Sequence, residues 1–101
     1  MEKRLQLQEI LKSLIDNQKV YFQPPENIRM EYPCIVYERD YAVTEYANNS
    51  PYAHTKRYQV TVIDKDPDSE IPDRVANLPL CKFAQHFKAD NLNHDVYNLY
   101  F

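Results

Sequence analysis

Four acidic side chains fall within seven positions of the sequence, a density typical of sites that bind a metal or transfer a proton: Asp64, Asp66, Asp68 and Glu70. They lie in the stretch VIDKDPDSEIPDRV, residues 62–75. An EF-hand calcium loop requires glycine at its sixth position and glutamate at its twelfth, and counting from Asp64 these positions hold Ser69 and Val75. The sequence therefore excludes a calcium site of that kind. A looser Mg²⁺ site stays open, although a phosphoryl-transfer site would need further acids or a basic clamp.

The same segment also fits the end of a strand followed by the start of a helix. Asp66 precedes Pro67, and this pair is typical of a helix N-cap followed by proline at the first helical position. Acidic residues in the first turn are favoured by the helix dipole. Pro72 fits this helix only if the helix begins nearer Ser69, and Pro79 ends it. We therefore expect the acids to end a strand and cap a short helix, and a small metal-dependent hydrolase is the outside alternative.

The other residues that could do chemistry form no catalytic or metal-binding motif. Zinc-like spacings are absent around His54, His86 and His94, and neither Cys34 nor Cys81 lies in a nucleophile-elbow or CxxC sequence. The chain contains no glycine, which excludes the P-loop and G-x-G-x-x-G loops, whose backbone must approach a phosphate without a Cβ. The sequence therefore predicts no catalytic residue, no metal, no cofactor and no enzymatic activity, with both thiols reduced and buried.

Length and composition predict one soluble globular domain, residues 1–101, with 44% hydrophobic and 27% charged residues. The net charge is −3 and the 12 basic residues are scattered, which argues against sequence-specific binding of nucleic acid. No apolar run is long enough for a membrane span or a signal peptide, so a cytosolic product is expected. A chain of this length buries a thin core, and association with partners would add burial.

The pattern of apolar residues predicts an α+β domain. In residues 2–17, an amphipathic helix is indicated by Leu7, Ile10, Leu11 and Leu14 at helical spacing. The other expected elements are a short strand at 20–22, long strands at 34–46 and 54–64, the short helix, and strands at 82–89 and 94–101. This order, α-β-β-β-α-β-β, predicts an antiparallel sheet with a long β-hairpin arm and with the helices packed on one face.

The two long strands are expected to project as a hairpin arm, with ANNSPYA at its tip. Asn48 and Asn49 tolerate the left-handed backbone that a turn without glycine needs. Tyrosine is enriched at contacts between proteins because it combines a large rigid area with one polar group. We expect Tyr46 and Tyr52, at the exposed end of the arm, to contact a partner. Ordinary positions in the strands are expected for Tyr37, Tyr58 and Tyr97.

The order of elements and two stretches, YPCIVYE at 32–38 and YQVTVIDKDPDSEIPDRV at 58–75, resemble the tail-terminator and head–tail joining (neck) proteins of long-tailed bacteriophages and prophages. This resemblance covers nearly the whole chain. It implies a non-enzymatic structural protein that forms a homo-oligomeric ring, usually a hexamer. Such a ring caps the tail tube and joins it to the head connector or head-closure protein, so its subunits are found in the bacterial cytoplasm during assembly and in the virion neck afterwards.

The resemblance implies no catalytic residue, and contact positions are the only sites that we can nominate. On the arm these are Tyr46, Asn48, Asn49, Tyr52 and His54. Arg29 and Arg39 are candidates for charge pairs with the acids at 64–70 of the next subunit. A head-closure protein or another minor tail component is the alternative within this class.

Overall fold

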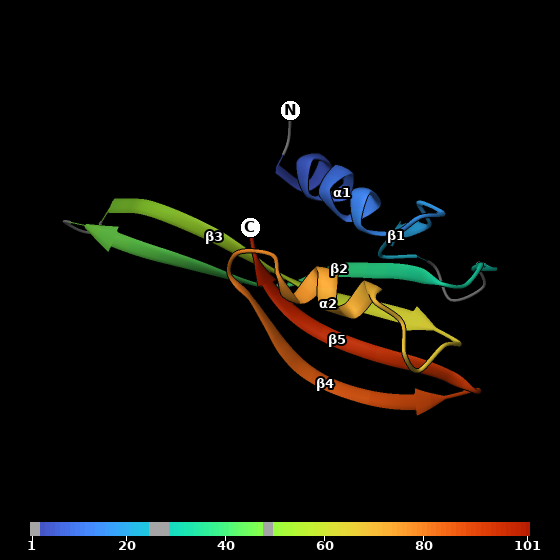
Figure 1. Ribbon diagram of the computed structural model, residues 1–101. Coiled ribbons are helices and arrows are strands. Elements are labelled where there is room, and N and C mark those ends of the chain that lie inside the picture. Colours follow the sequence, from blue (N-terminus) through green and yellow to red (C-terminus); the bar gives the residue numbers. More distant parts are fainter. Residues whose placement is uncertain (1–2, 25–28, 48–49) are drawn as a thin grey trace.

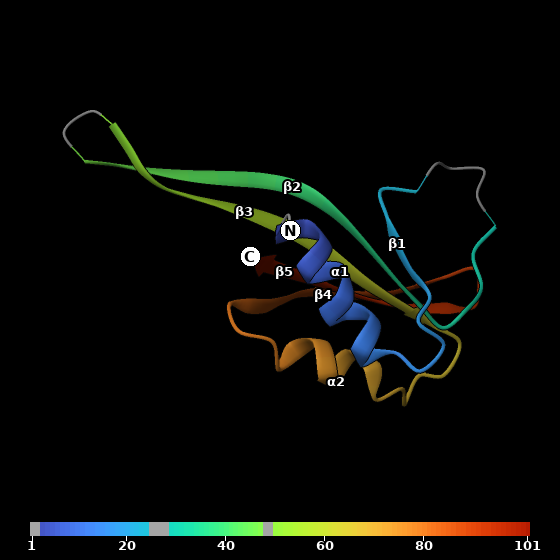
Figure 2. The ribbon, with the colours of Figure 1, turned by 90° about the horizontal axis from the view of Figure 1, so that it is seen from above.

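The computed structural model (Figure 1) describes residues 3–24, 29–47 and 50–101, and for residues 40–47 and 50–55 the description is of the backbone. Within this part of the chain, five strands form one sheet. In order across the sheet, the strands are β1 (Val20–Phe22), β2 (Cys34–Ala47), β3 (Ser50–Asp64), β5 (Leu92–Tyr100) and β4 (Cys81–Ala89). The two helices, α1 (Lys3–Leu14) and α2 (Ile71–Ala76), pack on one face of the sheet. The α+β class and the order of elements are therefore confirmed. The molecule is elongated, 51 × 24 × 23 Å, because the hairpin of β2 and β3 projects beyond the other strands (Figures 1 and 2).

Helix α1 spans Lys3–Leu14 and packs on the sheet through the predicted apolar stripe. Leu7 and Leu11 are buried, together with Ile15 just after the helix. The helix ends earlier than the expected boundary near Asn17. Arg74 stabilises this end, since its Nη1 donates a hydrogen bond of 3.0 Å to the carbonyl oxygen of Leu14, which no longer has a partner within the helix.

Strand β1 (Val20–Phe22) pairs with β2 (Cys34–Ala47) in parallel, with Val20 opposite Ile35. The expectation of a purely antiparallel sheet is therefore wrong at this edge. Parallel strands need a connection long enough to bring the chain back to its starting end. Residues 23–33 are long enough for this connection. Strand β2 therefore runs in the same direction as β1, and the sheet is mixed.

Strands β2 and β3 (Ser50–Asp64) pair antiparallel along almost their whole lengths, from Cys34 opposite Ile63 to Ala47 opposite Ser50. Strand β3 therefore begins earlier than the expected residue 54. The register shifts twice in this hairpin, between Arg39 and Tyr41 and between Glu45 and Tyr46. Such β-bulges bend a strand and increase its local twist.

Strands β4 (Cys81–Ala89) and β5 (Leu92–Tyr100) form the second hairpin, with Ala89 opposite Leu92. Its two turn residues, Asp90 and Asn91, have φ angles of 53° and 62°. A two-residue turn with both φ angles positive matches the right-handed twist of the strands, and Asn and Asp are the residues after glycine that best tolerate it. The glycine-free turn expected in DNLN is confirmed, and β5 begins two residues before the expected start.

The core lies between the helices and one face of the sheet. On this face Tyr37, Val60 and Tyr97 stand opposite one another on β2, β3 and β5, and all three are buried with residues of both helices. The expected positions of Tyr37, Tyr58 and Tyr97 within strands are confirmed, and all three side chains are buried. On the other face, Cys34 and Ile63 belong to a smaller apolar cluster that Tyr21, Met30 and Tyr32 partly cover.

Candidate subunit interface

The acidic segment at 64–70 forms a series of turns between β3 and α2. Asp64 Oδ1 accepts a hydrogen bond from the backbone nitrogen of Asp66 (3.0 Å), and Asp66 Oδ1 accepts one from the backbone nitrogen of Asp68 (2.9 Å). These are Asx turns, in which a side chain binds the backbone two residues further on. Ser69 continues the pattern, since its Oγ accepts a hydrogen bond from the backbone nitrogen of Ile71.

The expectation that Asp66 caps the following helix is wrong. Helix α2 spans Ile71–Ala76 and its N-cap residue is Glu70, whose side chain makes no capping hydrogen bond in the part of the chain that the structure describes. Pro72 lies in the first turn, as a helix that begins nearer Ser69 requires. Asp66 and Pro67 form turns instead because an Asx turn satisfies the same backbone donors as an N-cap without starting a helix.

The geometry of this segment does not gather its carboxylates around a metal. Among the described residues, no group of three or more His, Cys, Asp or Glu side chains is arranged to hold a metal ion. Asp64 and Asp66 use one oxygen each for the turns, and Glu70 Oε2 lies 3.5 Å from Arg74 Nη2. Asp64 and Asp66 therefore serve to form turns, and Glu70 forms an ion pair with Arg74.

We expect the double substitution Asp64→Ala with Asp66→Ala to lower the free energy of unfolding by about 1 kcal/mol, because each exposed hydrogen bond contributes little. The measurement is urea denaturation with and without Mg²⁺. Asp68→Ala is the matched control, since the Asp68 carboxylate accepts no such bond within the described part of the chain. A Mg²⁺-dependent rise in the free energy of unfolding that only the double variant loses would contradict the structural role.

The histidines lie in the second hairpin, apart from His54, whose side chain is outside the described residues. His86 Nδ1 lies 2.7 Å from Asp95 Oδ1 on the neighbouring strand. His94 stacks on Phe87, with ring centroids 4.6 Å apart, and its Nε2 is buried without a hydrogen-bond partner among the described residues. Burial lowers the pKa of His94 below its ordinary value of 6.5, because the charged ring would lose its hydration.

This lowered pKa predicts a loss of stability in acid. The unfolded chain binds a proton at His94 near pH 6.5, whereas the folded chain does so only at lower pH. The contribution is therefore fully present above about pH 6.5 and is lost as the pH falls through the folded pKa. We expect His94→Gln to reduce the drop in unfolding free energy between about pH 7.5 and about pH 5.5. His86→Gln is the control, and an equal drop in wild type and His94→Gln would contradict the assignment.

The two cysteine thiols are buried to different extents, and burial raises the pKa of both. Cys34 is fully buried, and burial, with a smaller effect of Asp64, raises the pKa of its thiol to about 12. Cys81 is half-buried rather than buried as expected, and burial still raises its pKa.

The hydroxyl of Tyr37 donates a 2.8 Å hydrogen bond to Gln8 Oε1, and the hydroxyl of Tyr97 donates a 3.1 Å hydrogen bond to the carbonyl oxygen of Pro72. These hydroxyls connect the sheet to the two helices.

The arm leaves the sheet where the other strands end. Strand β3 pairs with β5 only from Arg57 to Asp64, and β1 pairs with β2 only from Ile35 to Tyr37. Beyond these limits, β2 and β3 pair with each other alone in the described structure, up to Ala47 opposite Ser50. Within the described ranges, the arm therefore carries two edges that pair with no further strand.

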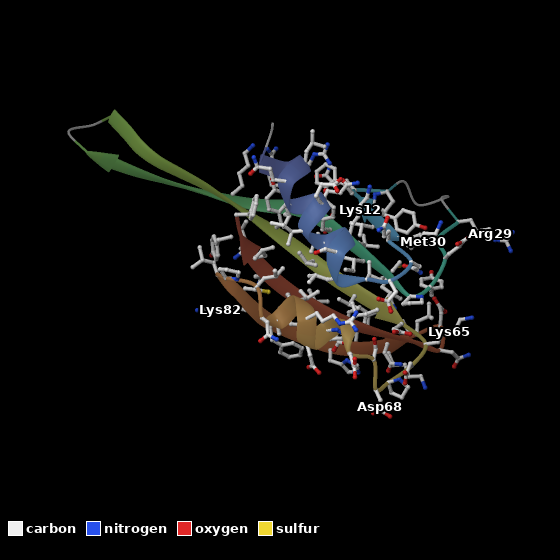
Figure 3. The ribbon with its side chains drawn as sticks, turned by 45° about the horizontal axis from the view of Figure 1, so that its top comes forward. Lys12, Arg29, Met30, Lys65, Asp68 and Lys82 are labelled. Atoms are coloured by element: carbon white, nitrogen blue, oxygen red, sulfur yellow. The ribbon has the colours of Figure 1, made fainter. Side chains whose placement is uncertain are left out.

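Of the five residues predicted to make contacts on the arm, three lie in described strands. Tyr46 lies near the end of β2, and Tyr52 and His54 lie near the start of β3, with side chains outside the described residues. Asn48 and Asn49 lie outside them altogether. Arg29 and Arg39 are exposed, and the acidic segment follows the opposite end of β3 from the arm tip. Figure 3 shows Arg29, Lys65 and Asp68 at the end of the molecule away from the arm.

Sequence reasoning missed two exposed apolar surfaces. One is a groove of about 290 Å³ between α1, the turn before β4 and the end of the chain, where Leu80 is 71% exposed. The other is strand β4, in which Phe83 and Phe87 are 59% and 42% exposed. The only signal for the second surface is the pair Lys82 and Lys88, because lysine is frequent on unpaired edge strands.

No helix in the described ranges is long and apolar enough to cross a membrane. When the chain is compared with known proteins, no family model matches it and no curated protein is significantly similar to it.

Proposed function

We propose that this protein is the ring-forming tail-terminator subunit of a long-tailed bacteriophage or prophage, which caps the tail tube and joins it to the head connector. The observation that carries the proposal is the arm, a two-stranded ribbon that projects from the sheet and pairs with no other described strand. A head-closure or other neck protein would use the same kind of arm, and it is the alternative within this class.

An isolated two-stranded ribbon is marginally stable in water, because it has little apolar area to bury and two open edges. A folded domain that carries such a ribbon gains stability when the ribbon lies on another molecule. The groove next to Leu80 and the exposed strand β4 offer apolar surface for that contact. These features support a protein that functions by association.

The distribution of these surfaces supports a head-to-tail contact. The arm tip and the acidic segment lie at opposite ends of β3, so one copy can present its arm to a different surface of the next. Contacts between two different surfaces produce closed rings when the rotation between copies closes. In such a ring, we propose that Arg29 and Arg39 pair with Asp64, Asp66, Asp68 or Glu70 of the neighbouring copy.

The experiment that tests the proposal is the solution mass, measured by light scattering after size exclusion over a range of protein concentrations, with and without Mg²⁺. A discrete assembly of about six copies that appears as rings in negative-stain images is the expected result. Tail tubes purified without their terminator provide the second arm of the test, because the protein should bind their ends and stop their elongation. A strict monomer that neither assembles nor binds tube ends would contradict the proposal.

A further inference from the structure

Strand β4 is an open edge of the sheet with apolar side chains. It lies at one edge of the sheet, and within the described part of the chain β5 is the only strand that pairs with it. Every residue from Lys82 to Ala89 is exposed. An unpaired edge presents a row of backbone donors and acceptors to which another strand can be added.

The charge of β4 restricts which strand can be added. Its sequence, CKFAQHFKA, contains Lys82 and Lys88 and no acidic residue. If two copies of β4 paired antiparallel about Gln85, Lys82 of each copy would stand opposite Lys88 of the other, and like charges directly opposite are destabilising. Figure 3 shows Lys82 on the outer strand, far from Lys65 and Asp68. The edge therefore favours an acidic strand over a second copy of itself.

The arm has one edge with the complementary charge. From Asp40 to Ala47, β2 pairs only with β3 among the described strands, and these eight residues, DYAVTEYA, include Asp40 and Glu45 and no basic residue. The opposite edge of the arm, on β3, carries Lys56 and includes Pro51, which has no backbone N–H to donate. Of the two open edges, that of β2 is the better partner for β4.

We propose that residues 40–47 of one copy pair with β4 of the next copy and extend its sheet by one strand. This inference rests on the proposed function and specifies which surfaces meet. The pairing cannot occur within one chain, because β3 and β5 lie between β2 and β4 in the sheet. The lengths agree, with eight residues on the arm and nine in β4. The added strand covers Phe83 and Phe87, and it places Asp40 and Glu45 near the two lysines.

Charge reversal tests this pairing directly. Lys82→Glu with Lys88→Glu should weaken assembly at least about tenfold, because like charges then face each other across the interface. Asp40→Lys with Glu45→Lys should do the same, and the protein that carries all four substitutions should assemble again. Lys12→Glu with Lys19→Glu is the matched control, since it makes the same charge change on α1 and just before β1, away from β4 and from the acidic segment, and should leave assembly intact. Circular dichroism checks that each variant is folded.

Amide hydrogen exchange distinguishes strand addition from contact through side chains alone. Alternate amides of β4 point away from β5 and should become protected when the wild-type protein assembles. A wild-type assembly that is unaffected by Lys82→Glu with Lys88→Glu and leaves β4 unprotected would overturn this inference but not the proposed function. A wild-type protein that forms no assembly, in solution or on tail tubes, would overturn both.

Discussion

Replacement of the arm tip by a tight turn is expected to abolish assembly and leave the fold of the subunit intact. The variant replaces residues 44–54 with Asn-Gly, which joins Val43 to Thr55. These two residues stand directly opposite each other on β2 and β3, so a two-residue turn closes the shortened hairpin without changing its register. On β3, the described core residues begin at Tyr58, which the shortened hairpin keeps.

The measurement is light scattering of the variant and the wild type at equal concentrations, with thermal unfolding as the check on folding. The matched control places the same Asn-Gly pair at Asp90 and Asn91, where the backbone already has the positive φ angles that this turn requires. The control should assemble normally. Assembly of the shortened-arm variant with wild-type mass and concentration dependence would rule out the arm as a subunit contact. A simple deletion of residues 47–52 tests the same idea with a less favourable turn.

Leu11→Ala is expected to lower the free energy of unfolding by about 3 kcal/mol, the largest effect on stability among the predictions made for this protein. Leu11 is completely buried in the cluster that joins α1 to Tyr37 of the sheet and Val75 of α2. Its removal leaves a cavity at the junction of three elements. Because small domains are stable by only about 5–15 kcal/mol, the loss should lower the melting temperature by roughly 10–20 °C.

Urea denaturation followed by circular dichroism measures this loss. Leu5→Ala is the matched control, because Leu5 lies on the same helix, is 41% exposed, and loses the same atoms. The control should change the free energy of unfolding by no more than about 0.5 kcal/mol. Equal values for the two variants would mean that α1 does not pack on the sheet through its predicted stripe.

Much of the fold follows from the sequence where one local pattern leaves no competing structure. The stripe of α1 defines its buried face, and the three residues of β1 stand out between polar segments. Asp90 and Asn91 indicate the second turn because few other residues accept left-handed backbone. Each buried tyrosine lies two positions from another apolar residue of its strand, which places both on one face; the pairs are Ile35 and Tyr37, Tyr58 and Val60, and Tyr97 and Leu99.

The predictions that the structure contradicts also failed for physical reasons. A strand of three residues carries no information about its direction, so the parallel pairing of β1 could not be predicted. Asp66 followed by Pro67 fits both an N-cap and an Asx turn, and the choice depends on where α2 packs through Ile71 and Val75. The exposure of β4 was missed because its sequence, CKFAQHFKA, mixes apolar and polar residues as a half-buried strand does. Whether β4 is covered depends on the order of strands, which a local pattern does not encode.

The bulge at the base of the arm has a consequence for the symmetry of an assembly built through it. Asp40 is the extra residue between the pairs Arg39–Tyr58 and Tyr41–Arg57, at the point where the ribbon leaves the sheet. Because a bulge bends and twists a ribbon, this one affects the direction in which the arm projects from the sheet. In the proposed ring, the rotation from one copy to the next, and hence the number of copies that close the ring, would follow from this direction.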